Sequence, residues 1–283
     1  MNRIGLSTVA LLLCGLSFLS EHSQDRYSEE KHSKSSVAAS EAQTKKILRE
    51  IRDLGNHDWA GQYYYGDGLG VNVELSLAPQ NGFVFTWHGC LGLYDLNYGD
   101  VSFTQGTVKL LFKYSNEPGK GFQGIAPELV PVHWGHRHYL IPADGMIRFT
   151  NAINSGMEPS PPGGRSWRFL LRRGDEQKTV DGLPDIPSEY LSYILKEPVR
   201  ARVSSITETR MEKERRITRV TLNVGSADGL KKGMELFVKQ PSRVYLDAVV
   251  TEVGEHWSSA VIEQDEKSDP APSPGWSLST RLN

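Results

Sequence analysis

Apolar and polar residues alternate along the first half of the chain, and this pattern predicts β-strands. Valine and leucine alternate with polar residues over 71–77, as in a strand with one solvent-exposed face. A turn at 79–82 leads to a returning apolar run at 83–87, and residues 105–106 suit a tight hairpin. Other strands are predicted at 91–95, 101–105, 107–114, 129–133, 137–141 and 167–172. Seven or eight strands that close on themselves would form a meandering barrel or curled sheet over residues 57–180.

Three short stretches have helical rather than strand periodicity. Apolar residues recur every three or four positions over 41–54, and Gly55 is a typical residue for ending a helix. This helix is expected to pack its stripe of apolar side chains on the domain that follows. Asp144 is predicted to cap a second helix that ends at Gly156, and a third is predicted over 188–195.

The second half of the chain returns to strands. They are predicted at 199–207, 216–224, 234–239, 244–253, 257–263 and 276–281. Between the second and third, Gly225, Gly229 and Gly233 are expected to allow sharp turns with positive φ, with Leu230 tucked beneath them. The chain is therefore predicted to be mainly β with minor α. A β-rich domain with short helices occupies residues 41–198, and a small β-barrel occupies residues 199–283.

The turn at Asn223–Met234, followed by strands at 235–238 and 248–253, resembles a motif of small β-barrels in envelope proteins. The similar domains are the C-terminal domain of the flagellar assembly protein FlgT and a β-domain of the rod-shape protein MreC. The resemblance implies an SH3-like barrel that acts as a non-enzymatic scaffold or assembly module beside a membrane. It is a signature of the fold and transfers no catalytic residue.

A second resemblance lies at the start of the predicted front barrel. Trp59, Gly61 and Tyr63 look like the Gly-x-aromatic opening of lipocalin-like barrels, whose aromatic residue closes the barrel floor. This resemblance implies a cavity for a small apolar ligand.

The first twenty residues have the features of an export signal. Arg3 precedes an apolar run over residues 4–20, and a polar stretch follows. Three outcomes stay open: cleavage after Ser17, retention as a membrane tether, or lipidation of Cys14. Each outcome places the folded part outside the cytoplasmic membrane. Residues 21–40 are mixed in charge and rich in serine, so they are predicted to be a disordered linker.

Composition narrows the class of partner. A net charge of −2 over 283 residues argues against nucleic-acid binding, which needs an excess of Lys and Arg. The chain has 2 cysteines, so cleavage of the leader would leave Cys90 alone, without an internal disulfide. Cys90 follows His88 closely, but a buried structural thiol is favoured over a nucleophile because no strand-turn-helix elbow surrounds it.

Three histidines, His133, His136 and His138, are the candidate metal ligands. On one strand His136 and His138 would share a face, and His133, His88 or a distant carboxylate would complete a zinc site. The alternative is a solvated sheet edge or a polar pocket wall. No cofactor is predicted for the chain, and zinc binding by these histidines is kept as a minor alternative.

Two charged stretches are interpreted as solvated surface. Arg168, Arg172 and Arg173 are expected at an exposed strand end, and residues 207–216 at an exposed hairpin tip that could dock on anionic lipid or a partner. Together these features predict an exported, non-enzymatic binding or assembly module. Its partner would be another envelope protein or a membrane-associated component. The alternatives are a carrier of a small apolar ligand and a zinc-dependent hydrolase.

Overall fold

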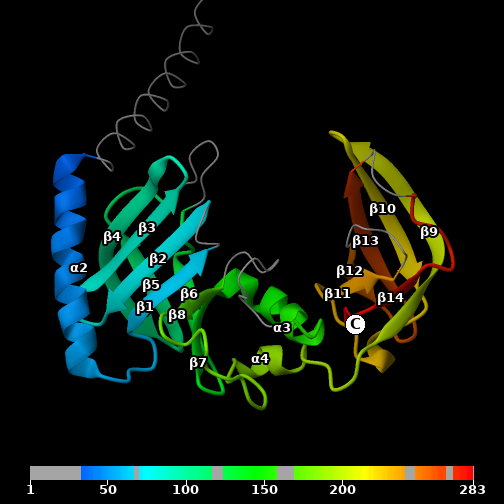
Figure 1. Cartoon of the computed structure of the whole chain (residues 1–283). Coiled ribbons are helices and arrows are strands. Elements are labelled where there is room, and N and C mark those ends of the chain that lie inside the picture. Colours follow the sequence, from blue (N-terminus) through cyan, green and yellow to red (C-terminus); the bar gives the residue numbers. More distant parts are fainter. Residues whose placement is uncertain are drawn as a thin grey trace, which may run out of the picture. The chain divides into compact units, whose positions relative to one another are not determined.

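The alternating segments of the first half close into an antiparallel barrel in the computed structural model of the protein (Figure 1). The structure describes residues 33–66, 70–116, 124–157, 169–239, 246–265 and 270–282. Its described strands follow one another around the barrel in chain order: β1 (Gly61–Gly66), β2 (Val71–Ala78), β3 (Gly82–Gly89), β4 (Gly92–Thr104), β5 (Thr107–Phe112), β6 (Glu128–Trp134), β7 (Arg137–Pro142) and β8 (Leu170–Arg172). Of the predicted alternatives, seven or eight strands in a meandering barrel or a curled sheet, the structure shows the closed barrel, with eight described strands.

The described residues divide into two compact units. The first holds the described residues up to Pro131 together with Arg172–Glu176, and the second holds the described residues of Val132–Leu171 and those from Gln177 onward. The domain limits drawn from the sequence, at residue 41 and between residues 198 and 199, stay predictions. The leader over residues 1–20 lies outside the described residues. In the part of the chain that is described, no helix combines the length and the apolar character needed to span a bilayer.

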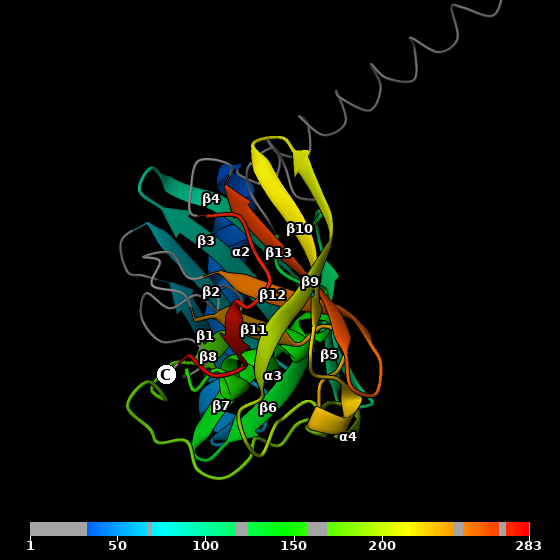
Figure 2. The same ribbon diagram turned by 90° about the vertical axis from the view of Figure 1, so that its right-hand side faces the viewer.

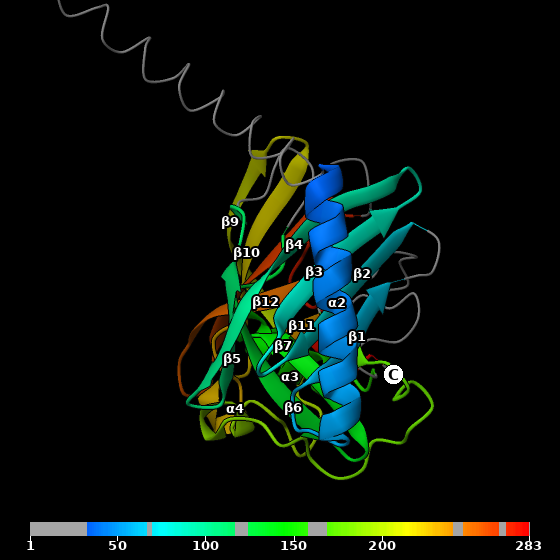
Figure 3. The same cartoon turned by 90° about the vertical axis from the view of Figure 1, so that its left-hand side faces the viewer.

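Helix α2 (Lys34–Leu54) lies across β2, β3 and β4 of the first unit (Figure 3). Polar side chains fix it there. The Gln43 amide donates to the carbonyl oxygens of Asn81, Phe83 and Gly99 at 3.0, 3.3 and 3.0 Å. Glu50 accepts from the backbone amides of Gln80 and Asn81 at 2.8 and 2.9 Å. The prediction that this helix packs on the following domain is confirmed.

The helix begins seven residues before its predicted start, at Lys34 rather than Glu41. Ser33 caps it, and Ser36 and Ser40 of its first turns are buried rather than part of a solvated linker. Ser36 is buried and its hydroxyl lies 2.6 Å from the hydroxyl of Tyr114. Small side chains allow this close approach, and their polarity made the segment look like disordered chain. The assignment of residues 34–40 to a linker is therefore wrong, while residues 21–32 lie outside the described residues.

The two strands predicted at 91–95 and 101–105 form one continuous strand, β4. Polar residues interrupt the apolar alternation in the middle of this strand, but they are buried. Asp95 accepts from the Leu96 amide, and the Asn97 side chain donates to the Tyr114 carbonyl at 3.1 Å. Because internal hydrogen bonds satisfy these groups, the strand continues through a stretch where the apolar alternation fails.

The second unit contains helix α3 (Met146–Asn154), which follows the 3₁₀ turn η1 (Ala143–Gly145). The predicted capping by Asp144 is wrong, because Gly145 stands at the N-cap and no side chain caps this helix. The helix places Phe149 in a buried aromatic cluster with Tyr139 and Phe169, at ring distances of 5.6 and 5.3 Å. Helix α4 (Ser188–Leu191) is shorter than the predicted 188–195.

The second half of the chain forms a closed barrel of described strands, in the spatial order β10, β13, β12, β11, β14, β9. Their bounds are β9 (Arg200–Glu212), β10 (Arg215–Leu222), β11 (Glu235–Val238), β12 (Asp247–Val253), β13 (Ser258–Asp265) and β14 (Ser277–Ser279). Val220, Leu222, Leu236, Ala248 and Ile262 fill its core. The predicted C-terminal β-barrel is confirmed.

The turn between β10 and β11 has the predicted compact form. It contains η2 (Ser226–Asp228), and Leu230 is buried beneath it. Gly225 differs from the expectation, since its φ is −147°. Glycine is required there for space instead, because a Cβ atom at Gly225 would lie 2.4 Å from the carbonyl oxygen of Gly254.

Helix α3 is bonded to the C-terminal barrel within the second unit. The buried Asn151 side chain donates to the Gly233 carbonyl at 2.9 Å and accepts from the Glu235 amide at 3.3 Å. Asn154 donates to the Tyr193 carbonyl and accepts from the Leu195 amide, each at 2.9 Å. These side chains satisfy backbone groups at the entry to β11 and after α4.

Candidate functional site

The histidine segment forms the hairpin of β6 and β7, but it groups the rings differently from the prediction. His133 on β6 and His138 on β7 face each other with ring centroids 4.6 Å apart. His136 lies exposed in the turn between the strands, where its backbone amide donates to the Thr179 carbonyl at 3.2 Å. Among the described residues, no group of three or more His, Cys, Asp or Glu side chains is arranged to hold a metal ion. Zinc binding stays a prediction.

Cys90 is exposed, so the prediction of a buried thiol is wrong. Gly89 pairs with Gly92 at the end of β3 and the start of β4, which leaves only Cys90 and Leu91 in the turn. The turn places both side chains at the end of the hairpin, where Leu91 is 90% exposed. His88 lies nearby on β3 and is also exposed.

The buried Tyr63 and the partly buried Arg172 form a contact between the first and the last strand of the front barrel. The Tyr63 hydroxyl donates to the Trp59 carbonyl at 3.0 Å. The Arg172 guanidinium donates to the carbonyl of His57 at 2.6 Å and to the Tyr63 hydroxyl at 3.0 Å. It also lies 5.5 Å from the centre of the Tyr63 ring, a cation–π distance.

Arg172 is therefore a structural residue, and its interpretation as part of a solvated strand end is wrong. In the sequence, Gly61 is the residue that fits this contact, because a Cβ atom at position 61 would lie 3.0 Å from the Arg172 side chain. Arg173 fits the exposed interpretation better: it pairs with Glu74, and both side chains are nearly half exposed. Arg168 lies outside the described residues.

Tyr63 gives the protein a predicted stability loss at high pH. Burial raises the pKa of Tyr63 to about 12, although the Arg172 guanidinium acts to lower it. In the unfolded chain the Tyr63 hydroxyl titrates near the ordinary tyrosine pKa of 10.0. The contribution of Tyr63 to the free energy of unfolding is thus complete below about pH 10. It is lost as the pH rises to about 12, and the loss is about 2–3 kcal/mol.

Urea unfolding at a series of pH values checks this prediction. The free energy of unfolding should fall more steeply between about pH 10 and about pH 12 in the wild type than in Tyr63→Phe, by about 2 kcal/mol. Tyr190→Phe, which removes the hydroxyl of a half-buried tyrosine on α4, should keep the wild-type slope. Equal slopes in all three proteins would contradict the buried, neutral Tyr63.

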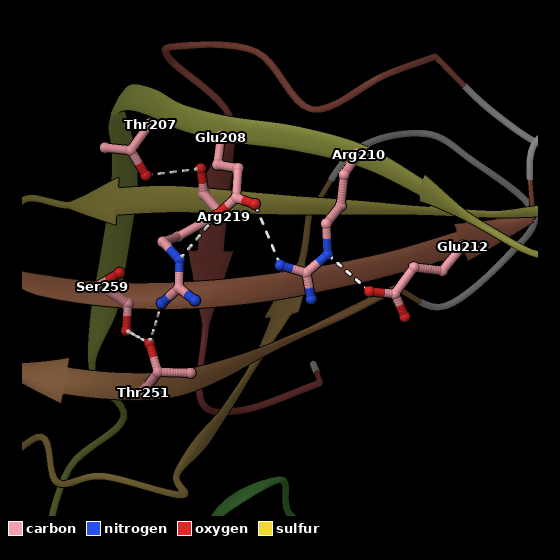
Figure 4. A network of polar contacts seen from close by, with 7 residues as sticks. All are labelled: Thr207, Glu208, Arg210, Glu212, Arg219, Thr251 and Ser259. Carbon is pink, nitrogen blue, oxygen red and sulfur yellow. Dashed lines mark hydrogen bonds and ion pairs between the residues drawn. The ribbon is translucent and has the colours of Figure 1, made fainter. Parts of the chain in front are cut away.

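The β9–β10 hairpin carries an alternating series of charges on one face (Figure 4). Arg210 pairs with Glu208 at 3.1 Å and with Glu212 at 2.7 Å, and these carboxylates raise the pKa of its guanidinium. Glu208 also lies 3.6 Å from Arg219 on β10. We call this set of side chains, completed by Arg215 and its partner Glu263 at 3.4 Å, the charged face.

The hairpin extends to a tip at Lys213 and Glu214 (Figure 2). Every residue of β9 from Thr207 to Glu212 is exposed, on both faces of the strand. The interpretation of residues 207–216 as an exposed hairpin tip is therefore confirmed. A strand that is exposed on both faces contributes little to the core of its own barrel.

Comparison with known protein families, characterised proteins and solved structures finds no match to this chain. The resemblances to FlgT, MreC and lipocalin-like barrels accordingly stay predictions. The candidate functional site is the β9–β10 hairpin, where β9 is exposed on both faces over Thr207–Glu212.

Proposed function

We propose that this chain is an exported, non-catalytic binding or assembly module of the cell envelope. The β9–β10 hairpin is its binding surface. Export is proposed from the leader over residues 1–20, and an SH3-like type for the C-terminal barrel from the turn at residues 223–234. The observation that carries the proposal is that β9 remains a strand over six residues, Thr207–Glu212, that are exposed on both faces.

Such a segment is unusual because exposed strand edges promote association with other chains. Natural proteins use this property for recognition, since an added strand gains main-chain hydrogen bonds and places alternate side chains in contact. The charged face then supplies the specificity, because each of its charges must meet a charge of opposite sign on the partner.

The composition of the charged face favours a protein over an anionic membrane. Three guanidiniums, from Arg210, Arg215 and Arg219, are each paired with a carboxylate on the same face. A surface that binds anionic lipid needs an excess of positive charge. The balanced face lacks this excess and instead suits a partner with both signs of charge.

Site-specific photo-cross-linking in cells tests the proposal. A photoreactive residue is placed at Thr209 on β9 of the full chain, and a control is placed at Glu252, an exposed position on β12 of the same barrel. Position 209 should form an adduct of defined mass, while position 252 should form none. The control has comparable exposure, so an adduct confined to position 209 reports binding at the hairpin.

A further inference from the structure

One side of β9 is paired with β10 from Val203 to Glu212, while the other side, its outer edge, is paired only at the start. On the outer edge, β14 pairs with Arg200–Arg202. Two further bonds involve Val203, which donates to the Trp276 carbonyl at 2.9 Å and accepts from the Gly275 amide at 2.8 Å. Beyond Val203, no other described strand pairs with this edge as far as Glu212.

The outer edge carries charged side chains and bulges, which discourage strand addition, but it lacks the other usual features that prevent it. Residues 204–212 contain no proline, no glycine and no lysine, and threonine and isoleucine favour the extended conformation. Two irregularities are present: the register with β10 shifts between Arg219 and Val220 and again between Thr221 and Leu222, so Thr207 and Ser204 are bulged residues. The regular part of the edge therefore runs from Glu208 to Glu212.

The charges on this regular part are complementary to a second copy of themselves. Glu208, Arg210 and Glu212 share one face because side chains alternate along a strand. When two such strands pair antiparallel with Thr209 opposite Thr209, Glu208 of each copy stands opposite Arg210 of the other. The pairing thus creates two Glu–Arg contacts between copies, related by a twofold axis.

Other registers that keep the charges on one face are unfavourable. Centring the pair on Arg210 places arginine opposite arginine and Glu208 opposite Glu212. Centring it on Met211 requires the turn residues Lys213 and Glu214 to extend the strand, yet their φ angles are 52° and 40°. The Thr209 register avoids both problems, with regular pairing limited to Glu208–Arg210 because Met211 of each copy faces the bulged Thr207 of the other.

We propose that two copies of this chain associate through the outer edges of their β9 strands, antiparallel and centred on Thr209. This inference rests on the proposed function, because it takes the hairpin as the binding surface and names its occupant. The β9–β10–β13 sheets of the two copies become one continuous sheet, with the charged faces on the same side. The edge involves few residues, so we expect association in the micromolar to millimolar range.

Sedimentation equilibrium of the purified full chain tests this register through charge exchange. The wild type should dimerise. Glu208→Arg and Arg210→Glu should each dimerise at least about tenfold more weakly, because each variant places like charges opposite each other twice. An equimolar mixture of the two variants should regain the wild-type affinity, since the arginine introduced at position 208 of one copy then meets the glutamate introduced at position 210 of the other.

Glu212→Arg is the matched control. It changes the net charge as much as Glu208→Arg does and also removes an ion pair with Arg210, but it lies outside the two contacts. Its dimer affinity should stay near that of the wild type. Recovery in the mixture cannot arise from misfolding, because two misfolded variants would not restore each other.

The inference is overturned if the wild type is monomeric throughout the micromolar to millimolar range. It is also overturned if the dimer affinity in the mixture stays as low as in each variant alone. A loss of affinity in Glu212→Arg equal to that in Glu208→Arg also overturns the register. The proposed function is judged separately by the cross-link at position 209. An adduct there with a different protein or with lipid, together with a monomeric wild type, retains the hairpin as a binding surface and rejects the second copy.

Discussion

Replacing Gly82 with alanine should lower the free energy of unfolding by about 4 kcal/mol. Gly82 has a φ of +69°, where a residue with a side chain is strained by about 1–3 kcal/mol. Its Cβ atom would also lie 1.9 Å from the carbonyl oxygen of Gly99 and 3.0 Å from the Gln43 amide nitrogen. That clash involves backbone on a neighbouring strand and a bond that holds α2, so local relaxation cannot relieve it.

Urea denaturation of Gly82→Ala and Gly106→Ala separates the two contributions. Gly106 has a similar φ of +74°, but no atom lies within 4 Å of its hypothetical Cβ. Gly106→Ala should therefore cost only the conformational strain, about 1 kcal/mol. Equal losses in the two variants would contradict a close contact between position 82 and the Gly99 carbonyl.

Truncating Phe149 to alanine should destabilise the protein by about 3–5 kcal/mol, because it removes the centre of a buried aromatic cluster. Phe149 has 0% exposure. Its ring makes edge contacts with Trp134, Tyr139 and Phe169 at centroid distances of 6.4, 5.6 and 5.3 Å. Trp134 and Tyr139 are held by β6 and β7 and Phe169 lies directly before β8, so these rings cannot collapse fully into the vacated volume.

Thermal or urea unfolding measures this effect, with Leu91→Ala as the control. Leu91 is the same kind of large apolar residue but is 90% exposed, so its truncation should change stability by less than about 0.5 kcal/mol. A loss below about 1 kcal/mol in Phe149→Ala would contradict the assignment of this residue to the core.

Periodicity and turn chemistry predicted the two barrels. The period of two over 71–77 corresponds to β2, and residues 105–106 form the tight turn between β4 and β5. These signals are local: an alternating strand and a turn residue that adopts positive φ each specify their conformation without distant partners. Closure of the front barrel follows because consecutive antiparallel strands would otherwise leave exposed edges.

The incorrect predictions concern residues whose environment comes from distant parts of the chain. Ser36 is helical and buried because Tyr114 binds its hydroxyl. Arg172 is structural because it bonds to Tyr63 and His57, which lie more than 100 residues away in the sequence. Composition classifies such polar residues as solvated, and only the tertiary structure reveals their partners.

The candidate site was predicted only in part. The sequence indicated that residues 207–216 form an exposed charged tip. It could not indicate that the outer edge of β9 extends beyond β14, because that depends on the short length of β14, Ser277–Ser279. For the histidines, the sequence indicated a different pair from the one that the structure brings together. His136 and His138 were expected on one face of a strand, but His136 lies in the turn and His133 faces His138 instead.

The cross-linking comparison between Thr209 and Glu252 in cells tests the central claim most directly. The claim is that this protein acts by binding and that the β9–β10 hairpin is where it binds. We expect a discrete adduct from position 209 and none from position 252, both of which are exposed in the same barrel. No adduct from position 209, or equal adducts from both positions, would contradict it.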